Sequence, residues 1–191
     1  MKIFSNFLVF LSSLFLFLIQ FFIFTFFINF AIGYFSFAPF VPTKKRDLKR
    51  VFELANLKEG ELVYELGSGD GRFLFEAVKK YKVKGVGVEI LFHLYLWCLI
   101  KRFFFKDKKN IQFKWGNLYE EDISKADVIY FWGMPKTIEK KLKKKLEKEA
   151  KKGCKIISYV FEIPGWKPEK VSWPKGEVPI YLYIKNHSDK I

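Results

Sequence analysis

Cysteine and histidine are scarce in this chain of 191 residues, which contains only Cys98, Cys154, His93 and His187. Neither cysteine stands in a paired motif, and the four side chains do not have the spacing of a zinc site. We therefore expect no metal, and we expect both cysteines to be small core residues in a reducing compartment. His93 lies in an apolar run, where a packed or exposed histidine is more common than a catalytic base.

Charged side chains are absent from residues 3–43. Within residues 7–32, twenty of the 26 side chains are Phe, Leu, Ile or Val. As a helix this segment would be about 39 Å long, enough to cross a hydrocarbon core of roughly 30 Å. A cleaved signal peptide is the alternative, but its apolar part is usually about 7–15 residues long and ends in small residues. Because Pro39 follows the only such site, Ala38, we predict a retained membrane anchor over residues 1–38.

The charges that flank this anchor predict its orientation. Lys2 is the only basic side chain before the apolar run, whereas residues 44–50 contain five lysines and arginines. Positive charge is enriched on the cytoplasmic side of membrane spans. We therefore predict a single-pass protein of the inner (cytoplasmic) membrane, with the rest of the chain in the cytoplasm.

Arginine is also scarce, since it supplies four of the 34 basic residues behind a net charge of +14. Residues 136–155 contain ten lysines against three glutamates, and Ile138, Leu142, Leu146 and Ala150 recur at every fourth position. This pattern predicts a helix with a narrow apolar stripe and a broad basic face. The basic face is either simply solvated or a contact for anionic lipid, worth about 1 kcal/mol per lysine. Nucleic acid is the weaker alternative, because base readout and stacking favour arginine and exposed aromatics.

A glycine-rich turn is the most informative feature that the chain does contain. Residues 63–73 read VYELGSGDGRF and residues 85–89 read GVGVE, which predicts a strand, a turn opening a helix, and a second strand ending in Glu89. In an open α/β sheet such a turn lets the backbone approach a nucleotide-like ligand, and the later carboxylate can bridge two ribose hydroxyls. A dinucleotide fingerprint fails because Arg72 replaces its third glycine. The turn also lacks the residues that define a P-loop and those that define a nucleophile elbow.

The turn instead reads E-x-G-x-G-x-G from Glu65. This resembles the first motif of class I methyltransferases, which bind S-adenosylmethionine and place that acid near the cationic methionine end. A glycine-rich turn without a ligand is the alternative, and the spacing to Glu89 argues against it.

Short strands and helices alternate along the rest of the chain. We predict five strands at residues 62–66, 85–89, 111–115, 127–132 and 155–161, followed by a hairpin of residues 170–173 and 179–184. This order predicts a parallel α/β sheet with an antiparallel edge and ligands at the carboxyl ends of the strands. The helix at 91–105 is apolar on more than one face. Its spare face either contacts the bilayer or the anchor, with basic side chains at the headgroups, or is buried.

The sequence FWGMP at residues 131–135 ends the fourth strand. It lacks the Asp or Asn followed by two prolines that is usual in methyltransferases acting on the amino groups of nucleic-acid bases. It also lacks the clustered acids that metal-assisted O-methyl transfer requires. An aromatic, uncharged rim of Tyr130, Phe131, Trp132 and Met134 remains, although alternation along the strand places at least one of these side chains in the core. The candidate acceptor-site residues are Tyr130, Trp132, Met134 and Pro135. Such a rim suits lysine, because desolvation favours the neutral amine that must attack.

The anchor, PFVPT at residues 39–43, YELGSGDGR, FWGMPKTIEKKLKKKLEKE and GWKPEKV together resemble the ATP synthase c-subunit and adenine nucleotide translocase lysine N-methyltransferases and their prokaryotic relatives. The resemblance covers roughly residues 39–171. It implies a seven-stranded Rossmann-like class I methyltransferase that uses S-adenosylmethionine to methylate lysine in proteins, often membrane-embedded ones. The implied division is an anchor at 1–38, a linker and pre-methyltransferase helix at 39–58, and a methyltransferase domain at 59–191.

The resemblance also implies the residues of the cofactor site. These are Thr43, Glu65, Gly67, Ser68, Gly69, Asp70, Gly71, Glu89, Asn117 and Leu118. Asn117 stands where an aspartate is commoner and could contact the adenine, or it is a loop asparagine held by local bonds. Two rival functions stay open: a methyltransferase for a small or lipid-like acceptor, and an inactive, membrane-tethered binding module.

Overall fold

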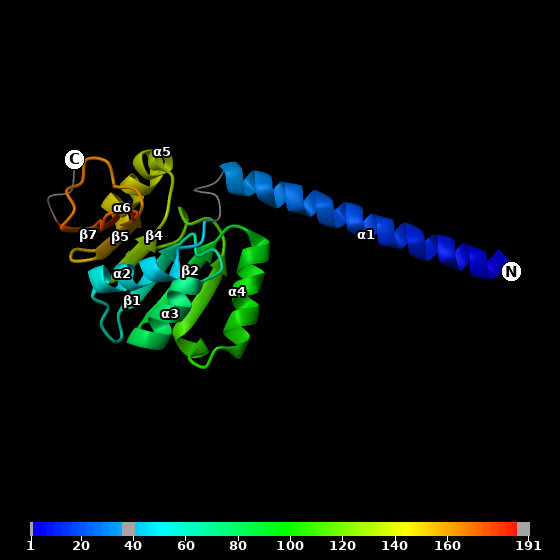
Figure 1. Cartoon of the computed structure of the whole chain (residues 1–191), viewed down its shortest axis with the longest axis horizontal. Helices are drawn as coiled ribbons and strands as arrows, with labels where there is room; N and C mark the ends of the chain where they lie inside the picture. The colour runs from blue at the N-terminus through cyan, green and yellow to red at the C-terminus, as the bar shows by residue number, and fades with distance from the viewer. Residues whose placement is uncertain (1, 36–40, 187–191) are drawn as a thin grey trace.

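The computed structural model describes residues 2–35 and 41–186. Ala38, Pro39 and His187, which enter the expectations above, lie outside the described residues. Helix α1, Lys2–Phe35, extends away from the α/β domain (Figure 1). Its stretch Val9–Ile28 is long and apolar enough to cross a membrane, by length and composition, and none of it is buried against the rest of the protein.

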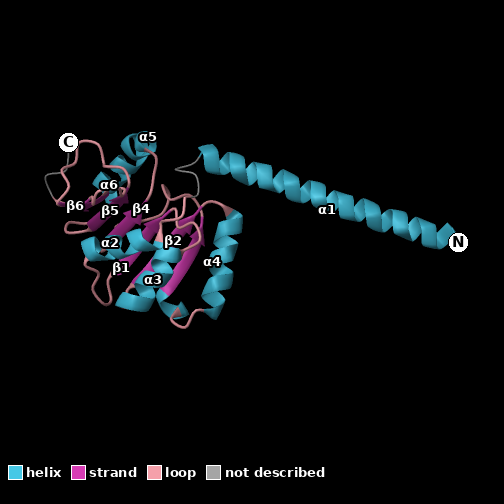
Figure 2. Ribbon diagram, in the orientation of Figure 1, coloured by secondary structure: helices cyan, strands magenta, loops and turns pink. Residues whose placement is uncertain are grey.

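The α/β domain is built on one seven-stranded mixed sheet (Figure 2). Its strands are β1 (Leu62–Leu66), β2 (Lys84–Glu89), β3 (Ile111–Trp115), β4 (Val128–Phe131), β5 (Lys155–Tyr159), β6 (Lys170–Ser172) and β7 (Ile180–Ile184). The spatial order is β3-β2-β1-β4-β5-β7-β6. The first five strands are parallel, whereas β7 runs antiparallel to both β5 and β6. The predicted parallel sheet with an antiparallel edge is therefore confirmed.

Strand order reverses at β1, which pairs with β2 on one side and with β4 on the other. In open α/β sheets the crossovers on the two sides of such a point leave in opposite directions, which opens a crevice at the carboxyl ends of the strands. The glycine-rich turn follows β1 directly, so the topology places it at this crevice.

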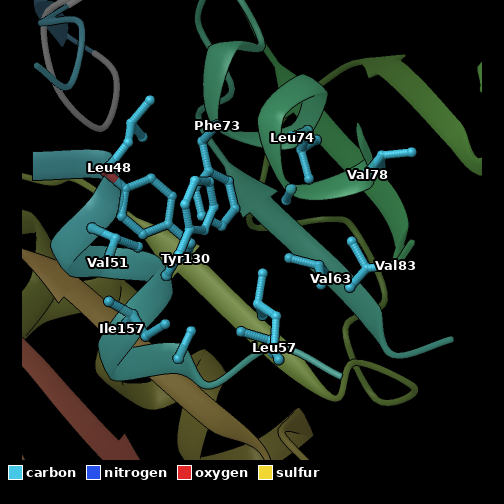
Figure 3. Packing of buried hydrophobic residues seen from close by; sticks show 14 of the residues in the cluster. Leu48, Val51, Leu57, Val63, Phe73, Leu74, Val78, Val83, Tyr130 and Ile157 are labelled. Atoms are coloured by element: carbon cyan, nitrogen blue, oxygen red, sulfur yellow. The ribbon is translucent and has the colours of Figure 1, made fainter. Parts of the chain in front are cut away.

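Helices cover both faces of the sheet. Alternate residues of the strands point to opposite faces, and they divide the core into two clusters. Val63 and Tyr130 belong to the cluster that contains buried residues of α2 (Lys45–Ala55), α3 (Arg72–Tyr81) and α4 (Phe92–Phe104). Figure 3 shows this cluster, in which the ring of Phe73 stacks on that of Tyr130 with centroids 4.2 Å apart.

The second cluster contains the apolar stripe of the basic helix. Ile138, Leu142, Leu146 and Ala150 are buried, as the four-residue spacing predicts. The helical segment is irregular, with a short α5 (Pro135–Thr137), a π-helical η2 (Ile138–Leu142) and α6 (Lys143–Glu149). A short 3-10 helix, η1 (Lys108–Asn110), lies directly before β3 in the chain.

Lys145 departs from the predicted solvated face. It is buried, and its Nζ donates hydrogen bonds to the carbonyl oxygens of Tyr119 and Glu121 at 3.1 and 2.6 Å. The same Nζ lies 2.6 Å from a carboxylate oxygen of Glu149. Lysine spacing alone could not show this, because the carbonyl partners come from a loop more than twenty residues earlier. Lys145 therefore fixes that loop to α6 and does not contribute to the basic surface.

Candidate functional site

The glycine turn between β1 and α3 adopts a conformation that other residues rarely take. Gly67, Gly69 and Gly71 have φ values of 81, 54 and 72°. The backbone N–H groups of Gly67 and Ser68 both donate to the carbonyl oxygen of Val88 at 3.0 Å, which fixes the turn to the end of β2. A Cβ atom on Gly71 would lie 2.7 Å from Cζ of Phe113. Glycine is therefore required at this position both by the backbone dihedral and by crowding.

A pocket opens beside this turn at the switch point of the sheet. Its lining comes from the segment before α2, the glycine turn, the end of β2, the start of α4 and the end of β4. It contains Thr43, Glu65, Gly67, Ser68, Gly69, Asp70, Glu89, Tyr130 and Trp132 from the residues that the sequence singled out. It also contains Val41 and Pro42, which precede Thr43 in the PFVPT segment, and Arg72, Leu91 and Leu94, which were not predicted as site residues.

Glu89 is held by the backbone at the tip of β2. Its Oε2 accepts a hydrogen bond from Gly69 N at 2.7 Å and its Oε1 accepts one from Leu91 N at 2.8 Å. Burial raises the pKa of the Glu89 carboxyl, although these backbone donors lower it in part. Because each carboxylate oxygen can accept more than one hydrogen bond, both oxygens retain capacity for a second donor. The side chain is therefore fixed and can still receive two neighbouring hydroxyl groups.

Two polar atoms of the pocket have no hydrogen-bond partner among the described residues. They are Oε2 of Glu65 and Oγ of Ser68, and both are buried. Burial raises the pKa of Glu65 well above its ordinary value, and the nearby Asp70 adds to this, while Lys101 acts in the opposite direction. An unpartnered buried polar group costs about 1–3 kcal/mol. A ligand with a cationic donor would supply the missing partner.

Arg72 connects the glycine turn to the segment before α2. Its Nε and Nη2 each lie 2.9 Å from an oxygen of Asp70, and its Nη1 donates to the carbonyl oxygen of Thr43 at 3.2 Å. Burial alone would raise the pKa of Asp70, but the Arg72 hydrogen bonds and the charge of Lys101 bring it below its ordinary value. Asp70 is therefore an ionised structural partner of Arg72.

The Tyr130 hydroxyl forms a second connection to this segment. It lies 2.7 Å from Oγ1 of Thr43, and both side chains are buried. Burial raises the pKa of Tyr130 well above its ordinary value, so the phenol is protonated at neutral pH. Tyr130 thus lies in the pocket wall, with its ring in the core, and Trp132 is the half-buried aromatic beside it.

Five of the predicted site residues do not line the pocket: Gly71, Asn117, Leu118, Met134 and Pro135. Asn117 Oδ1 accepts a hydrogen bond from Tyr119 N, and its Nδ2 donates to Glu120 Oε1, both at 3.1 Å. This is the local turn bonding that the sequence left open as an alternative. Leu118 is buried, whereas Met134 and Pro135 are exposed. Their roles toward cofactor or acceptor stay predictions.

Both cysteines are buried, as expected of small core residues. Burial raises the pKa of Cys98, and it raises that of Cys154 to about 12, so neither thiol ionises at neutral pH. Within the described ranges 2–35 and 41–186, no group of three or more His, Cys, Asp or Glu side chains could hold a metal ion.

Known proteins are similar to this chain in sequence and in architecture. The model of the ANTKMT methyltransferase domain matches residues 65–170. A protein-lysine N-methyltransferase of Saccharolobus islandicus (strain REY15A) is 35% identical over 161 residues, which cover 80% of this chain and 96% of that protein. The ATP synthase c-subunit lysine N-methyltransferase of Homo sapiens is 28% identical over 137 residues, which cover 70% of this chain and 56% of the human protein. This chain thus spans little more than half of the human relative.

A solved structure matches with a TM-score of 0.72 and 30% sequence identity. It is an RNA methyltransferase from Salinibacter ruber in complex with S-adenosyl-L-homocysteine, and the match covers 75% of this chain and 93% of that chain. Sequence and architecture therefore agree on a methyltransferase, while the named acceptors of these relatives differ.

Proposed function

Because the chain belongs to the ANTKMT methyltransferase domain family, and is thus a class I, S-adenosylmethionine-dependent methyltransferase, we propose that it is a membrane-anchored protein-lysine N-methyltransferase. The observation that carries the lysine acceptor is the 35% identity, over 80% of this chain, to a protein-lysine N-methyltransferase. The pocket at the switch point supports the proposal through its residues.

The pocket fits the cofactor through its unpartnered and backbone-held groups. When bound, S-adenosylmethionine supplies a methyl group activated on a cationic sulfur. Glu89 would accept hydrogen bonds from the ribose hydroxyls, because the backbone fixes its carboxylate and leaves capacity for further donors. Glu65 Oε2 and Ser68 Oγ, which are buried without a partner among the described residues, would receive the polar methionine end. The positive φ values of the glycines let the backbone pass close to the ligand.

The acceptor end of the pocket favours a neutral amine. We assign Val41, Pro42, Leu94 and Trp132 from the pocket lining to this end. An apolar surrounding lowers the pKa of a lysine ammonium, because desolvation penalises its charge. Among the described lining residues that could take up a proton, Glu65 and Glu89 are assigned to the cofactor, Asp70 is paired with Arg72, and Tyr130 is already protonated. The proton of the substrate lysine therefore leaves to solvent before attack, and the chain contributes mainly alignment of the two reactants.

The anchor is the second part of the proposal. We infer that Val9–Ile28 spans the inner membrane and that residues 59–191 form the catalytic domain in the cytoplasm, joined by the linker and helix of residues 39–58. The length and apolar composition of Val9–Ile28 support this, although a signal sequence near the N-terminus meets the same criteria. Flotation of the full chain with vesicles, compared with a chain that lacks residues 2–35, tests it. Equal recovery of both in the soluble fraction would contradict the anchor.

RNA is a second candidate acceptor, because the matched structure is that of an RNA methyltransferase and the net charge is +14. One experiment separates the two. The full chain in mild detergent receives S-adenosylmethionine with a radioactive methyl group, together with a lysine-rich protein, the same protein with acetylated lysines, or RNA. We expect label in the unmodified protein alone, and Glu89→Ala is the matched inactive control. Label in RNA, or transfer to the acetylated protein, would overturn the lysine acceptor.

A further inference from the structure

Helix α4 carries an apolar outer face that no described part of the chain covers. Phe92, Leu96, Trp97, Ile100, Phe103 and Phe104 are its exposed large side chains. They recur at intervals of three and four residues, so they form one stripe along the helix. Phe103 and Phe104 are 70 and 80% exposed. The sequence left open whether the spare face of this helix is buried, and the structure shows that it is exposed.

The opposite side of α4 already packs on the domain. Cys98 is buried, and its Sγ donates to the carbonyl oxygen of Gly69 at 3.3 Å. Lys101 Nζ donates to the carbonyl oxygen of Asp70 at 2.6 Å. Leu94 lines the pocket. Because this inner side is fixed against the glycine turn, α4 cannot rotate to bury its outer stripe.

The exposed surface continues beyond the helix and is bordered by cations. The ring of Trp115, which is exposed at the end of β3, lies edge-on to Phe92 with centroids 5.1 Å apart. Lys106, Lys108 and Lys109 follow the helix and are exposed, and Lys108 Nζ lies 5.4 Å from the centre of the Phe103 ring. Aromatic and aliphatic side chains beside lysines are the composition of surfaces that lie in a membrane interface.

The chain connection keeps this surface close to the proposed anchor. Helix α1 continues from Ile28 to Phe35, and six more residues lead to Val41 at the pocket. At 1.5 Å per helical residue and about 3.5 Å per extended residue, the pocket stays within roughly 30 Å of the end of the apolar stretch. Leu91 and Leu94 at the start of α4 line the same pocket. Figure 1 shows α4 at the edge of the domain nearest to α1.

We propose that the outer face of α4, together with Trp115, lies in the interface of an anionic bilayer and holds the pocket against the membrane surface. This assignment rests on the proposed anchor. The stripe enters the headgroup region, and the exposed Lys106, Lys108 and Lys109 contact anionic headgroups. The basic helix lies on the opposite face of the sheet, as the two core clusters show. Both surfaces cannot lie flat on one bilayer, and of these two helices α4 is the one with a stripe of exposed large apolar side chains.

Tryptophan fluorescence of the full chain in vesicles tests the proposal directly. The vesicles contain phosphatidylcholine and phosphatidylglycerol with brominated acyl chains, which quench tryptophans at the bilayer. We expect the double variant Trp97→Phe, Trp115→Phe to lose most of the quenched signal. The matched control Trp173→Phe removes an exposed tryptophan from the loop after β6 and should leave the quenched signal unchanged. Phenylalanine preserves the apolar surface, so folding is retained, which circular dichroism checks.

Further samples test whether an anionic bilayer is what covers the outer face of α4. We expect less quenching in vesicles of phosphatidylcholine alone, and we expect Lys140→Gln with Lys144→Gln on the basic helix to have no effect. Equal quenching with and without Trp97 and Trp115 would overturn the proposal, as would protection of these tryptophans by a second copy of the chain or by α1. Flotation of the full chain, compared with that of the chain that lacks residues 2–35 in the same vesicles, separates binding through the anchor from binding through α4. Neither readout depends on methyl transfer, so a failure here differs from a failure of the proposed enzyme.

Discussion

The two ends of the pocket are built in different ways. At the proposed cofactor end, strand β1, the glycine turn that follows it and the tip of β2 supply backbone N–H groups and the carboxyls of Glu65 and Glu89. At the proposed acceptor end, side chains come from three separate segments, with Val41 before α2, Leu94 in α4 and Trp132 after β4. The first end depends on local backbone geometry and the second on how distant segments pack. Substitutions should therefore act through different quantities at the two ends.

The largest effect is expected at Gly71. Gly71→Ala forces a left-handed dihedral and places a Cβ atom 2.7 Å from Phe113, whereas Gly153→Ala has the same kind of dihedral with nothing within 4 Å. The dihedral costs about 1–2 kcal/mol in each variant, and overpacking adds about 1–3 kcal/mol at Gly71 alone. Urea unfolding in mild detergent should show this difference. Equal losses in the two variants would mean that Phe113 moves aside.

Glu89→Ala should weaken cofactor binding with little change in acceptor preference. It removes the acceptors for Gly69 N, Leu91 N and the proposed ribose hydroxyls. Hydrogen bonds to a charged group contribute about 1.5–3 kcal/mol, so we expect affinity for S-adenosylmethionine to fall by about 10- to 100-fold. Calorimetry measures it, with the exposed Glu120→Gln as control. An unchanged affinity would exclude Glu89 from the cofactor site.

Glu65→Gln should act with opposite signs on stability and on binding. The pKa of Glu65 is raised by burial, so the folded protein retains a proton that the unfolded chain has lost. Stability from this group is therefore present below the ordinary glutamate pKa and falls as pH rises toward the raised pKa. The variant should remove this decline and be the more stable at neutral pH, yet bind cofactor less tightly. The free energy of unfolding in urea, measured across pH without cofactor for the unmodified protein and for Glu65→Gln, checks this prediction. A parallel decline of that free energy in both proteins would contradict it.

Tyr130→Phe should have a smaller effect, on the acceptor end. It breaks the 2.7 Å hydrogen bond to Thr43 that holds the segment before α2. A neutral buried hydrogen bond contributes about 0.5–1.5 kcal/mol. A double-mutant cycle that combines Tyr130→Phe with Thr43→Val should give a coupling energy of this size in urea unfolding. In Tyr130→Phe the KM for the acceptor should rise more than the KM for the cofactor. Additive losses would show that the hydrogen bond does not stabilise the segment.

The difference between the two ends also explains what the sequence could predict. Turn glycines and the carboxyls that follow them sit at fixed spacing along neighbouring strands, so Glu65, Gly69 and Glu89 were predictable as one site. Leu91 and Leu94 belong to a helix whose apolar residues face both the pocket and solvent, and no periodicity separates these roles. Buried Lys145 is similar, because its carbonyl partners are distant in sequence.

Strands and helices were predictable for the same local reason. Alternation and turn residues placed β1 to β7 to within a few residues, including the hairpin of β6 and β7. The exposure of α4 was not predictable, because an apolar helix next to a sheet reads as a buried one until the neighbours on its outer side are known. Only the packed structure shows that six large apolar side chains on its outer side remain exposed.

Asn117 should show the smallest effect and decides where the cofactor end stops. Its position after β3 predicts an adenine contact, yet its amide oxygen and nitrogen are both held by Tyr119 and Glu120 in a local turn. If these bonds persist with cofactor bound, Asn117→Ala removes no cofactor contact, and affinity should change by less than about 0.5 kcal/mol, as at an ordinary surface position. Calorimetry measures the affinity of this variant for S-adenosylmethionine, and the loss measured for Glu89→Ala serves as the reference. A loss near that of Glu89→Ala would mean that the turn opens and Asn117 contacts the ligand, which would extend the preformed cofactor end from β2 to β3.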